Sequence, residues 1–355
     1  MLKVDVPLDA ESYTVFIDQN ITNEINNQIY NLYRYDKVFV LTQKSVSQYV
    51  DEIFRESNVK IIYLDESENI KNISCVEKTI KVLVKHKCTR KSLIIGFGGG
   101  VITDFTGFIA SIYMRGIDHM FIPTTLLSMT DASIGGKTGI NIDKAKNLLG
   151  TFKQPKAVFI NPTFLYSLDQ KHIINGFAEI IKYALIFDKD FYYKISSDFN
   201  NLIKLSSNND IKNIIKKCCE YKRDIVVADQ FEKNKRMLLN FGHTIGHAIE
   251  AYYEYKNILH GEAVYYGMSG ASFISYKLNY LNEKEFHDIT NFIESIKKFP
   301  LKNINSNSLI SYLEYDKKRM GNKNNFILLN NIGNGIIKEN IDKELIKESI
   351  NFING

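Results

Sequence analysis

The chain has 355 residues, of which 45% are hydrophobic and 24% are charged, a composition typical of a globular protein long enough for two domains. Its net charge of +5 is small and its lysines are scattered, which argues against a nucleic-acid-binding surface. The N-terminus lacks an apolar signal core and no segment reaches the roughly 20 apolar residues of a membrane span, so we expect a cytoplasmic protein.

Short β-branched segments alternate with helical patterns in the first half of the chain. Strands are predicted over residues 37–42, 59–64, 92–95, 119–124 and 156–160, and helices over 44–55 and 74–87. Strands that alternate with helices indicate a parallel sheet covered on both faces. The first half is therefore predicted to be an α/β domain.

Long helical patterns dominate from about residue 175 onwards, with apolar residues at i, i+3 and i+4. Helices are predicted over residues 176–187, 189–206, 209–228, 240–253, 262–280, 284–298 and 340–352, with 325–329 as a strand candidate. We place the boundary so that residues 1–174 form the α/β domain and residues 175–355 an all-helical domain. The cysteines Cys75, Cys88, Cys218 and Cys219 show no CxxC spacing and are expected to be reduced.

A glycine cluster, Gly98-Gly99-Gly100, connects a predicted strand to a predicted helix. Such a turn lets backbone N–H groups approach a phosphate, although a purely structural turn fits equally well and the spacing is not G-x-G-x-x-G. Asp104 follows in the first turn of the helix, where it could cap the helix or bind a ribose hydroxyl. Thr124 and Thr125 follow another strand, at the position where open α/β sheets bind nucleotides.

Two loop lysines follow these elements. Lys137 comes directly after two glycines, and Lys146 is followed by Asn147. A lysine in such a loop is either solvated or in contact with an anion, and the sequence leaves both interpretations open.

Three of the seven histidines lie within eighteen residues, as His243, His247 and His260. On a helix, His243 and His247 would share one face at about 6 Å, and a third imidazole from the next segment would complete a typical divalent-metal site. The alternative is a pair of capping or surface histidines. No glutamate follows the first histidine, so this is not a zinc-peptidase motif.

Glu179 and Lys182 are i and i+3 on an otherwise apolar helical segment. They are either a surface ion pair or, for Glu179, a hard oxygen ligand beside two histidines. Further polar residues precede His243, and each taken alone is typical of an ordinary surface: Lys222, Glu232, Arg236 and Asn240.

Taken together, the motifs between residues 35 and 335 resemble the 3-dehydroquinate synthases, of the sugar-phosphate cyclase superfamily. The resemblance rests on GGGVITDFTGF, YMRG, IPTTLLSMTDASIGGKTGIN, KNLLGTF, GFAEIIKYALI, LLNFGHTIGHAIE, LHGEAV and YDKK, in this order. It implies a Rossmann-like NAD-binding domain, a helical metal-binding domain and a homodimer.

The resemblance also implies roles for individual residues. The metal ligands, for zinc or cobalt, would be Glu179, His243 and His260. The catalytic residues would be His247 with Glu232 as its partner, Lys182 and Asp131. NAD would contact Glu68, Lys71, Gly99, Gly100, Asp104, Thr124, Thr125, Lys137, Lys146, Phe164 and Ser167. The substrate would contact Lys137, Asn147, Lys182, Lys222, Arg236, Asn240 and Lys318, and Arg115 would reach the neighbouring subunit's site.

The activity implied is conversion of 3-deoxy-D-arabino-heptulosonate 7-phosphate to 3-dehydroquinate and phosphate in the shikimate pathway. NAD would oxidise the substrate and be regenerated after phosphate elimination, before an aldol step closes the ring. Another sugar-phosphate cyclase would act on a substrate without a carboxylate, whereas Lys222 and Arg236 suit a substrate that has one. A polyol dehydrogenase would not need the phosphate-binding lysines, and a non-catalytic binding protein would not need the ligand set.

Overall fold

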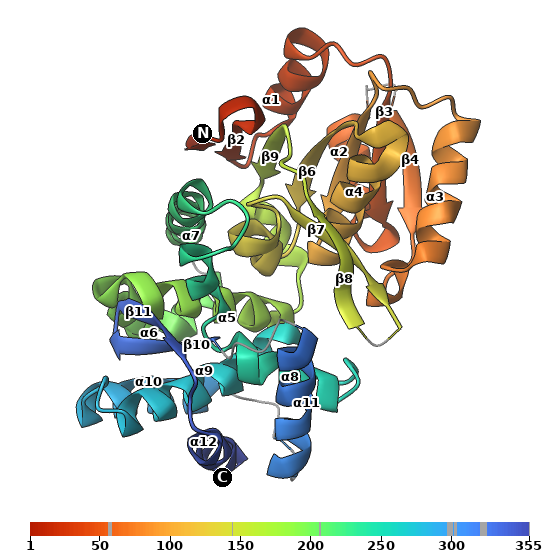
Figure 1. Cartoon of the computed structure of the whole chain (residues 1–355). Helices are drawn as coiled ribbons and strands as arrows, with labels where there is room; N and C mark the ends of the chain where they lie inside the picture. Colours follow the sequence, from red (N-terminus) through yellow and green to blue (C-terminus); the bar gives the residue numbers. More distant parts are fainter. Residues whose placement is uncertain are drawn as a thin grey trace. The chain divides into compact units, whose positions relative to one another are not determined.

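The computed structural model describes residues 1–55, 59–143, 145–205, 207–296, 301, 304–319 and 325–354. It divides into two compact units (Figure 1). Unit 1 comprises Met1–Ile173 and Leu205–Phe231, and unit 2 comprises Ile174–Lys204 and Glu232–Gly355. None of the described helices is long and apolar enough to cross a membrane.

A mostly parallel sheet forms the centre of unit 1, as the alternation of strands and helices predicted. Its strands within the described residues are β1 (Leu2–Val6), β2 (Tyr13–Ile17), β3 (Val38–Gln43), β4 (Val59–Leu64), β5 (Leu93–Gly98), β6 (Asp118–Pro123) and β9 (Ala157–Ile160). They are arranged in the order β1-β2-β9-β6-β5-β3-β4, and the β1–β2 pair is antiparallel while the others are parallel. The order reverses direction between β3 and β5, and the carboxyl ends of the strands at such a point are the expected place for a nucleotide.

The helices of unit 1 pack on this sheet through apolar faces. They are α1 (Thr22–Asn26), α2 (Ser47–Phe54), α3 (Ile73–Lys85), α4 (Gly100–Ile112) and α7 (Asn208–Ala228). One core combines Phe39 and Leu41 of β3 with Leu83 of α3 and Phe105 of α4. The two β3 residues are i and i+2, so they point to the same face of the sheet.

A hairpin of β7 (Lys137–Ile142) and β8 (Ala145–Phe152) packs beside α4, where the sequence predicted only loops. The hairpin can approach the helix because Gly107 has no side chain: a Cβ there would lie 2.3 Å from Cγ2 of Thr138. Ile140 of β7 joins the core of unit 1. The hairpin therefore fixes Lys137, Lys146 and Asn147 onto unit 1.

Unit 2 is helical apart from one hairpin, β10 (Asn325–Asn331) with β11 (Asn334–Glu339). Its described helices are α5 (Gln170–Phe187), α6 (Lys189–Leu202), α8 (His243–Tyr252), α9 (His260–Lys277), α10 (Glu283–Ile296), α11 (Ser306–Arg319) and α12 (Lys343–Asn354). Helix α9 is buried along nearly its whole length and is contacted by α8, α10, α12 and β10. A helix that is apolar on all sides is expected at the centre of a unit.

Helix α7 belongs to unit 1, although the sequence grouped it with the helical second half. It contacts β1 and the single turn over Ser128–Ala132, and Lys212 Nζ lies 3.1 Å from Oδ2 of Asp18. Helical periodicity shows that a segment is helical, but the partner of its apolar face is a non-local property. The first crossing between the units falls between Ile173 and Ile174, one residue before the predicted boundary.

Candidate functional site

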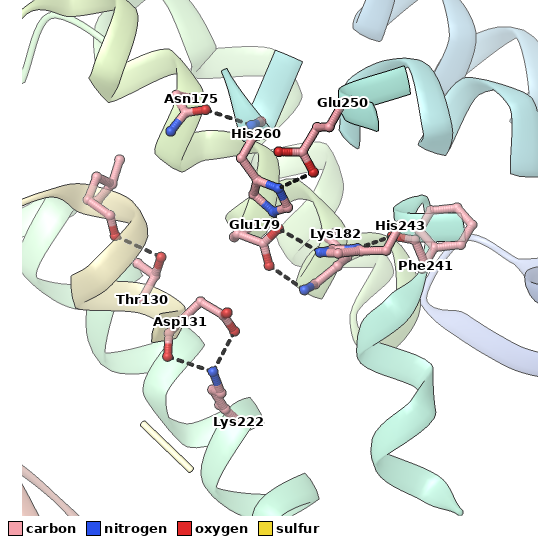
Figure 2. Close-up of polar contacts among 12 residues, drawn as sticks. Thr130, Asp131, Asn175, Glu179, Lys182, Lys222, Phe241, His243, Glu250 and His260 are labelled. Atoms are coloured by element: carbon pink, nitrogen blue, oxygen red, sulfur yellow. Dashed lines mark hydrogen bonds and ion pairs between the residues drawn. The ribbon is translucent and has the colours of Figure 1, made fainter. Parts of the chain in front are cut away.

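Glu179, His243 and His260 converge in unit 2 with the geometry of a metal-ligand set. Oε1 of Glu179 lies 3.5 Å from Nε2 of His243 and 3.6 Å from Nε2 of His260 (Figure 2). The three candidate ligand atoms all lie within 4.8 Å of one another. One carboxylate oxygen and two imidazole nitrogens are a donor set that zinc and similar divalent ions accept. The residues present therefore fit a divalent metal ion.

Other groups fix the orientation of these ligands. Lys182, one turn after Glu179 on α5, donates to Oε2 of Glu179, so Oε1 faces the histidines. Nδ1 of His243 lies 3.1 Å from the carbonyl oxygen of Phe241, which directs Nε2 of that ring towards Glu179. A hydrogen bond at one ring nitrogen fixes which nitrogen of the imidazole can bind a metal.

The pKa values of His243 and His260 shift in opposite directions, although burial alone lowers both. Burial lowers the pKa of His243 well below its ordinary value, and the positive charge of Lys182 acts in the same direction. Burial disfavours the charged form of His260 as well, but the carboxylates of Glu250 and Glu179 raise its pKa to about 10. The two carboxylates beside His260 therefore favour positive charge at this ring.

Close backbone packing by glycines brings the ligands together. Gly242 has a φ of +76° immediately before α8, and a Cβ on Gly267 of α9 would lie 1.8 Å from the carbonyl oxygen of Gly242. A Cβ on Gly261 would lie 2.2 Å from the carbonyl oxygen of Asn175, whose side chain accepts from the N–H of Gly261 at 2.6 Å. The glycines that punctuate the histidine motifs thus let α8, α9 and α5 approach one another.

His247 lies beside this ligand set and belongs, with Glu250 and His260, to a second group whose candidate ligand atoms all lie within 4.8 Å of one another. Its ring centroid is 5.2 Å from that of His243 and 6.1 Å from that of His260, and the residue is exposed. Glu232, its predicted partner, accepts from Nδ2 of Asn240 at 3.0 Å. Asn240 and Glu232, both predicted site residues, are thus a pair, and an accessible imidazole lies next to the candidate metal position.

The predicted nucleotide residues of unit 1 lie at the carboxyl ends of β5 and β6. The N–H of Thr124 donates to the carbonyl oxygen of Gly98 at 3.0 Å. A Cβ on Gly99 would lie 3.1 Å from Cγ2 of Thr125, and α4 begins at Gly100. The glycine turn, the two threonines and a helix N-terminus therefore form one surface that suits a phosphate.

A network of polar residues borders this turn and is centred on the buried Lys71. Its Nζ lies 2.7 Å from Oδ2 of Asp104, 3.5 Å from Oε1 of Glu68 and 2.5 Å from Oδ1 of Asn147. Although burial favours the neutral amine, the carboxylates of Asp104 and Glu68 raise the pKa of Lys71. Asn141, which the sequence did not indicate, donates to Glu68 and accepts from the N–H of Asn147.

The remaining nucleotide candidates and Arg115 occupy distinct places in unit 1. Phe164 is buried against the ring of Phe97, and its carbonyl oxygen accepts from Ser167 at 3.0 Å. Lys137 is the first residue of β7 and is exposed, and Lys146 is the second residue of β8 and is half-buried. Arg115 is exposed and has a φ of +69°.

Two of the predicted substrate contacts are buried cations. Nζ of Lys222 on α7 lies 2.8 Å from Oδ1 of Asp131 and 2.6 Å from its carbonyl oxygen (Figure 2). Arg236 is only 1% exposed in unit 2. The side chain of Lys318 lies outside the described residues. A buried cation must be compensated, so these positions suit an anionic ligand or a resident acid.

Two family models cover most of the chain. The model for the N-terminal part of 3-dehydroquinate synthase matches residues 61–175, and the model for the C-terminal part matches residues 176–319. In fold, the chain is similar to ValA, a 2-epi-5-epi-valiolone synthase from Streptomyces hygroscopicus solved with NAD+ and Zn2+ bound, with a TM-score of 0.88, 24% identity and 98% of each chain covered. It is equally similar to a 2-deoxy-scyllo-inosose synthase solved with carbaglucose-6-phosphate, NAD+ and Co2+, with a TM-score of 0.88, 24% identity and 99% of each chain covered.

Curated relatives match over nearly the full length of both chains. The 3-dehydroquinate synthase of Clostridium botulinum is 38% identical over 349 residues, which cover 94% of this chain and 96% of the relative. The 3-dehydroquinate synthase of Campylobacter hominis is 39% identical over 341 residues, which cover 94% of each. With both family models matched in order and relatives of this identity along the whole chain, the protein belongs to the 3-dehydroquinate synthase family.

Proposed function

We propose that the chain is a 3-dehydroquinate synthase that uses NAD and one divalent metal ion, zinc or cobalt. Its substrate would be 3-deoxy-D-arabino-heptulosonate 7-phosphate, and its products 3-dehydroquinate and phosphate. The observation that carries the proposal is the convergence of Glu179, His243 and His260 in a chain that matches both family models.

The metal ion would be held by Glu179, His243 and His260, where it would polarise a substrate hydroxyl and lower its pKa. Lys182 keeps Oε1 of Glu179 directed towards the histidines, and the Phe241 carbonyl keeps Nε2 of His243 directed towards Glu179. These two contacts preorganise the ligand set. His247, exposed beside it, is available to take or give a proton at an imidazole nitrogen.

NAD would be held by the glycine turn, Thr124, Thr125 and the Lys71–Asp104 network, and would accept a hydride and return it within one turnover. The backbone N–H groups at the start of α4 suit the pyrophosphate, and Asp104 can accept from a ribose hydroxyl. Further contacts are proposed for Glu68, Lys137, Lys146, Phe164 and Ser167.

The anionic groups of the substrate would be bound by buried or loop cations. Lys222 and Arg236, each less than 6% exposed, suit the carboxylate, with Asn240 as a further donor. Lys137, Asn147 and Lys182 suit the phosphate, and Lys318 is proposed as a further contact. A cyclase for a substrate without a carboxylate would have less need for these buried cations.

We also propose a homodimer in the cytoplasm, with Arg115 reaching the neighbouring site. Arg115 is exposed at the end of α4, next to Ile112 and Met114, which are 41% and 42% exposed. Apolar side chains around an exposed arginine suit a protein interface. Light scattering at micromolar concentration gives the mass, and mixing Arg115→Ala with His260→Ala tests shared sites, because mixed dimers should regain part of the activity.

The activity is tested by phosphate release from the heptulosonate phosphate with NAD and Zn2+, while absorbance at 340 nm is followed. Phosphate release that depends on both additives, without accumulation of NADH, supports the proposal. Stoichiometric NADH would indicate a dehydrogenase instead. Phosphate release only from sugar phosphates that lack a carboxylate would indicate another cyclase of the superfamily.

A further inference from the structure

A buried glutamate that no predicted role includes contacts one of the candidate metal ligands. Glu250 lies in the last turns of α8 and is 2% exposed. Its Oε2 is 3.3 Å from Nδ1 of His260, while Nε2 of the same ring lies 3.6 Å from Oε1 of Glu179 (Figure 2). The imidazole of His260 thus lies between two carboxylates on opposite sides of the ring.

His260 needs an anchor more than the other two ligands do. It is the first residue of α9, and its side chain is 28% exposed, against 12% for His243 and 2% for Glu179. His243 is held through Nδ1 by the carbonyl of Phe241, two residues away on the same segment. The corresponding contact of His260 comes from a different helix, through the side chain of Glu250.

A carboxylate at this position is costly unless it has a specific partner. Glu250 is itself 2% exposed, and Gly246, one turn earlier on α8, is also buried, so Glu250 lies on the buried side of its helix. Removing a carboxylate from water is strongly unfavourable unless a hydrogen-bonded partner compensates. An imidazole N–H is such a partner, and its orientation is fixed in return.

We propose that Glu250 is a positioning residue of the metal centre, an inference that rests on the metal site proposed above. Glu250 accepts the Nδ1–H of His260, which selects the tautomer with a lone pair on Nε2 and aims that lone pair at the ion shared with Glu179 and His243. Its effect on the ion is exerted through the imidazole. Partners of this kind change metal affinity by about 10- to 100-fold.

The test measures metal binding directly, in the full-length protein stripped with a chelator. The dissociation constants of Zn2+ and Co2+ are obtained by competition with a chromophoric chelator, and the visible absorption of bound Co2+ reports the ligand geometry. Glu250→Ala should weaken both metals about 10- to 100-fold and alter the Co2+ spectrum. Glu250→Gln, whose amide oxygen can still accept from Nδ1, should fall between Glu250→Ala and the wild type.

Two matched controls separate positioning of the ring from loss of packing. Glu262→Gln changes a carboxylate in the first turn of α9, which accepts from the N–H of Leu259 at 2.7 Å. Glu285→Gln changes a buried carboxylate of the same unit, paired with Lys189 at 2.7 Å. Both variants should bind Zn2+ and Co2+ as the wild type does, even where their melting temperatures fall.

Each outcome decides either the inference or the proposed metal centre. Wild-type affinity and an unchanged Co2+ spectrum in Glu250→Ala would overturn the positioning role, as would equal losses in Glu250→Gln and Glu262→Gln. If Glu250→Ala does not fold, the comparison of Glu250→Gln with Glu262→Gln decides. If wild type itself binds neither metal, or His260→Ala binds both normally, the proposed metal centre fails and not merely the role of Glu250.

Discussion

Acid should destabilise this protein through one buried histidine that has no part in the proposed site. His119 lies in β6, is 0% exposed and packs edge-on against Phe121 with ring centroids 4.8 Å apart. Neither of its ring nitrogens has a hydrogen-bond partner within the described residues. Burial, together with the positive charges of Lys153 and Lys156, lowers the pKa of His119 to about 3.

The sign and size of the effect follow from linkage. A group whose pKa is lower in the folded state contributes its full stability above the unfolded pKa, and that stability is lost as the pH falls. With pKa values of about 3 folded and about 6.5 unfolded, His119 should remove about 2 kcal/mol of unfolding free energy between pH 7 and pH 5. Replacing it with leucine removes this titration while keeping an apolar side chain in the core.

The assay is urea unfolding of wild type and His119→Leu at pH 7 and pH 5, with EDTA present and at one protein concentration. The decisive quantity is the loss of unfolding free energy between the two pH values, which should be about 2 kcal/mol smaller in the variant. His287→Gln is the control, because solvent reaches the 56%-exposed ring of His287 already in the folded state. Equal losses in wild type and His119→Leu would refute the reasoning.

Three further predictions concern the site and its packing. His243→Ala should lose bound zinc and lower the rate of phosphate release by more than about 100-fold, because it removes a metal ligand and not merely a hydrogen-bond partner of a ligand. Metal analysis and the phosphate-release assay check this. Gly267→Ala should lower the unfolding free energy by at least about 1–3 kcal/mol, because its Cβ would lie 1.8 Å from the Gly242 carbonyl oxygen. Urea unfolding of the variant and the wild type measures this loss. Lys222→Met should lower kcat/KM by about 10- to 100-fold through loss of a charged contact while leaving zinc affinity unchanged, which steady-state kinetics and metal titration test.

Local spacing could predict that His243 and His247 lie side by side, whereas only the family motifs pointed to Glu179 and His260 as the residues that join His243. His243 and the histidine one turn later share a helical face whatever the rest of the chain does. The glycines around them are equally local signals: Gly242 needs its positive φ, and Gly261 and Gly267 allow helices to touch. The short apolar, glycine-punctuated segment therefore predicts the His243–His247 pair, while the group of Glu179, His243 and His260 also needs α5 and α9.

Elements defined by non-local pairing could not be predicted in the same way. The β7–β8 hairpin has mostly half-buried or exposed residues in β8, so it lacks the clear alternation of a half-buried strand. Asn141 and Glu250 acquire their contacts only when β7 packs near the loop after β4 and when α8 packs on α9. A single asparagine or glutamate in a sequence gives no sign of such a partner.

Three buried lysines are each paired with a carboxylate that the sequence also placed in the site. Lys71 is paired with Asp104, Lys182 with Glu179, and Lys222 with Asp131. Because an uncompensated buried charge is very unfavourable, each lysine requires an anion whether or not a ligand is bound. An incoming phosphate or carboxylate must therefore compete with a resident carboxylate or share its lysine. Removing one of these acids, as in Asp131→Asn, should accordingly destabilise the protein yet tighten the binding of a simple anion such as phosphate or acetate, and isothermal titration of the variant would show whether it does.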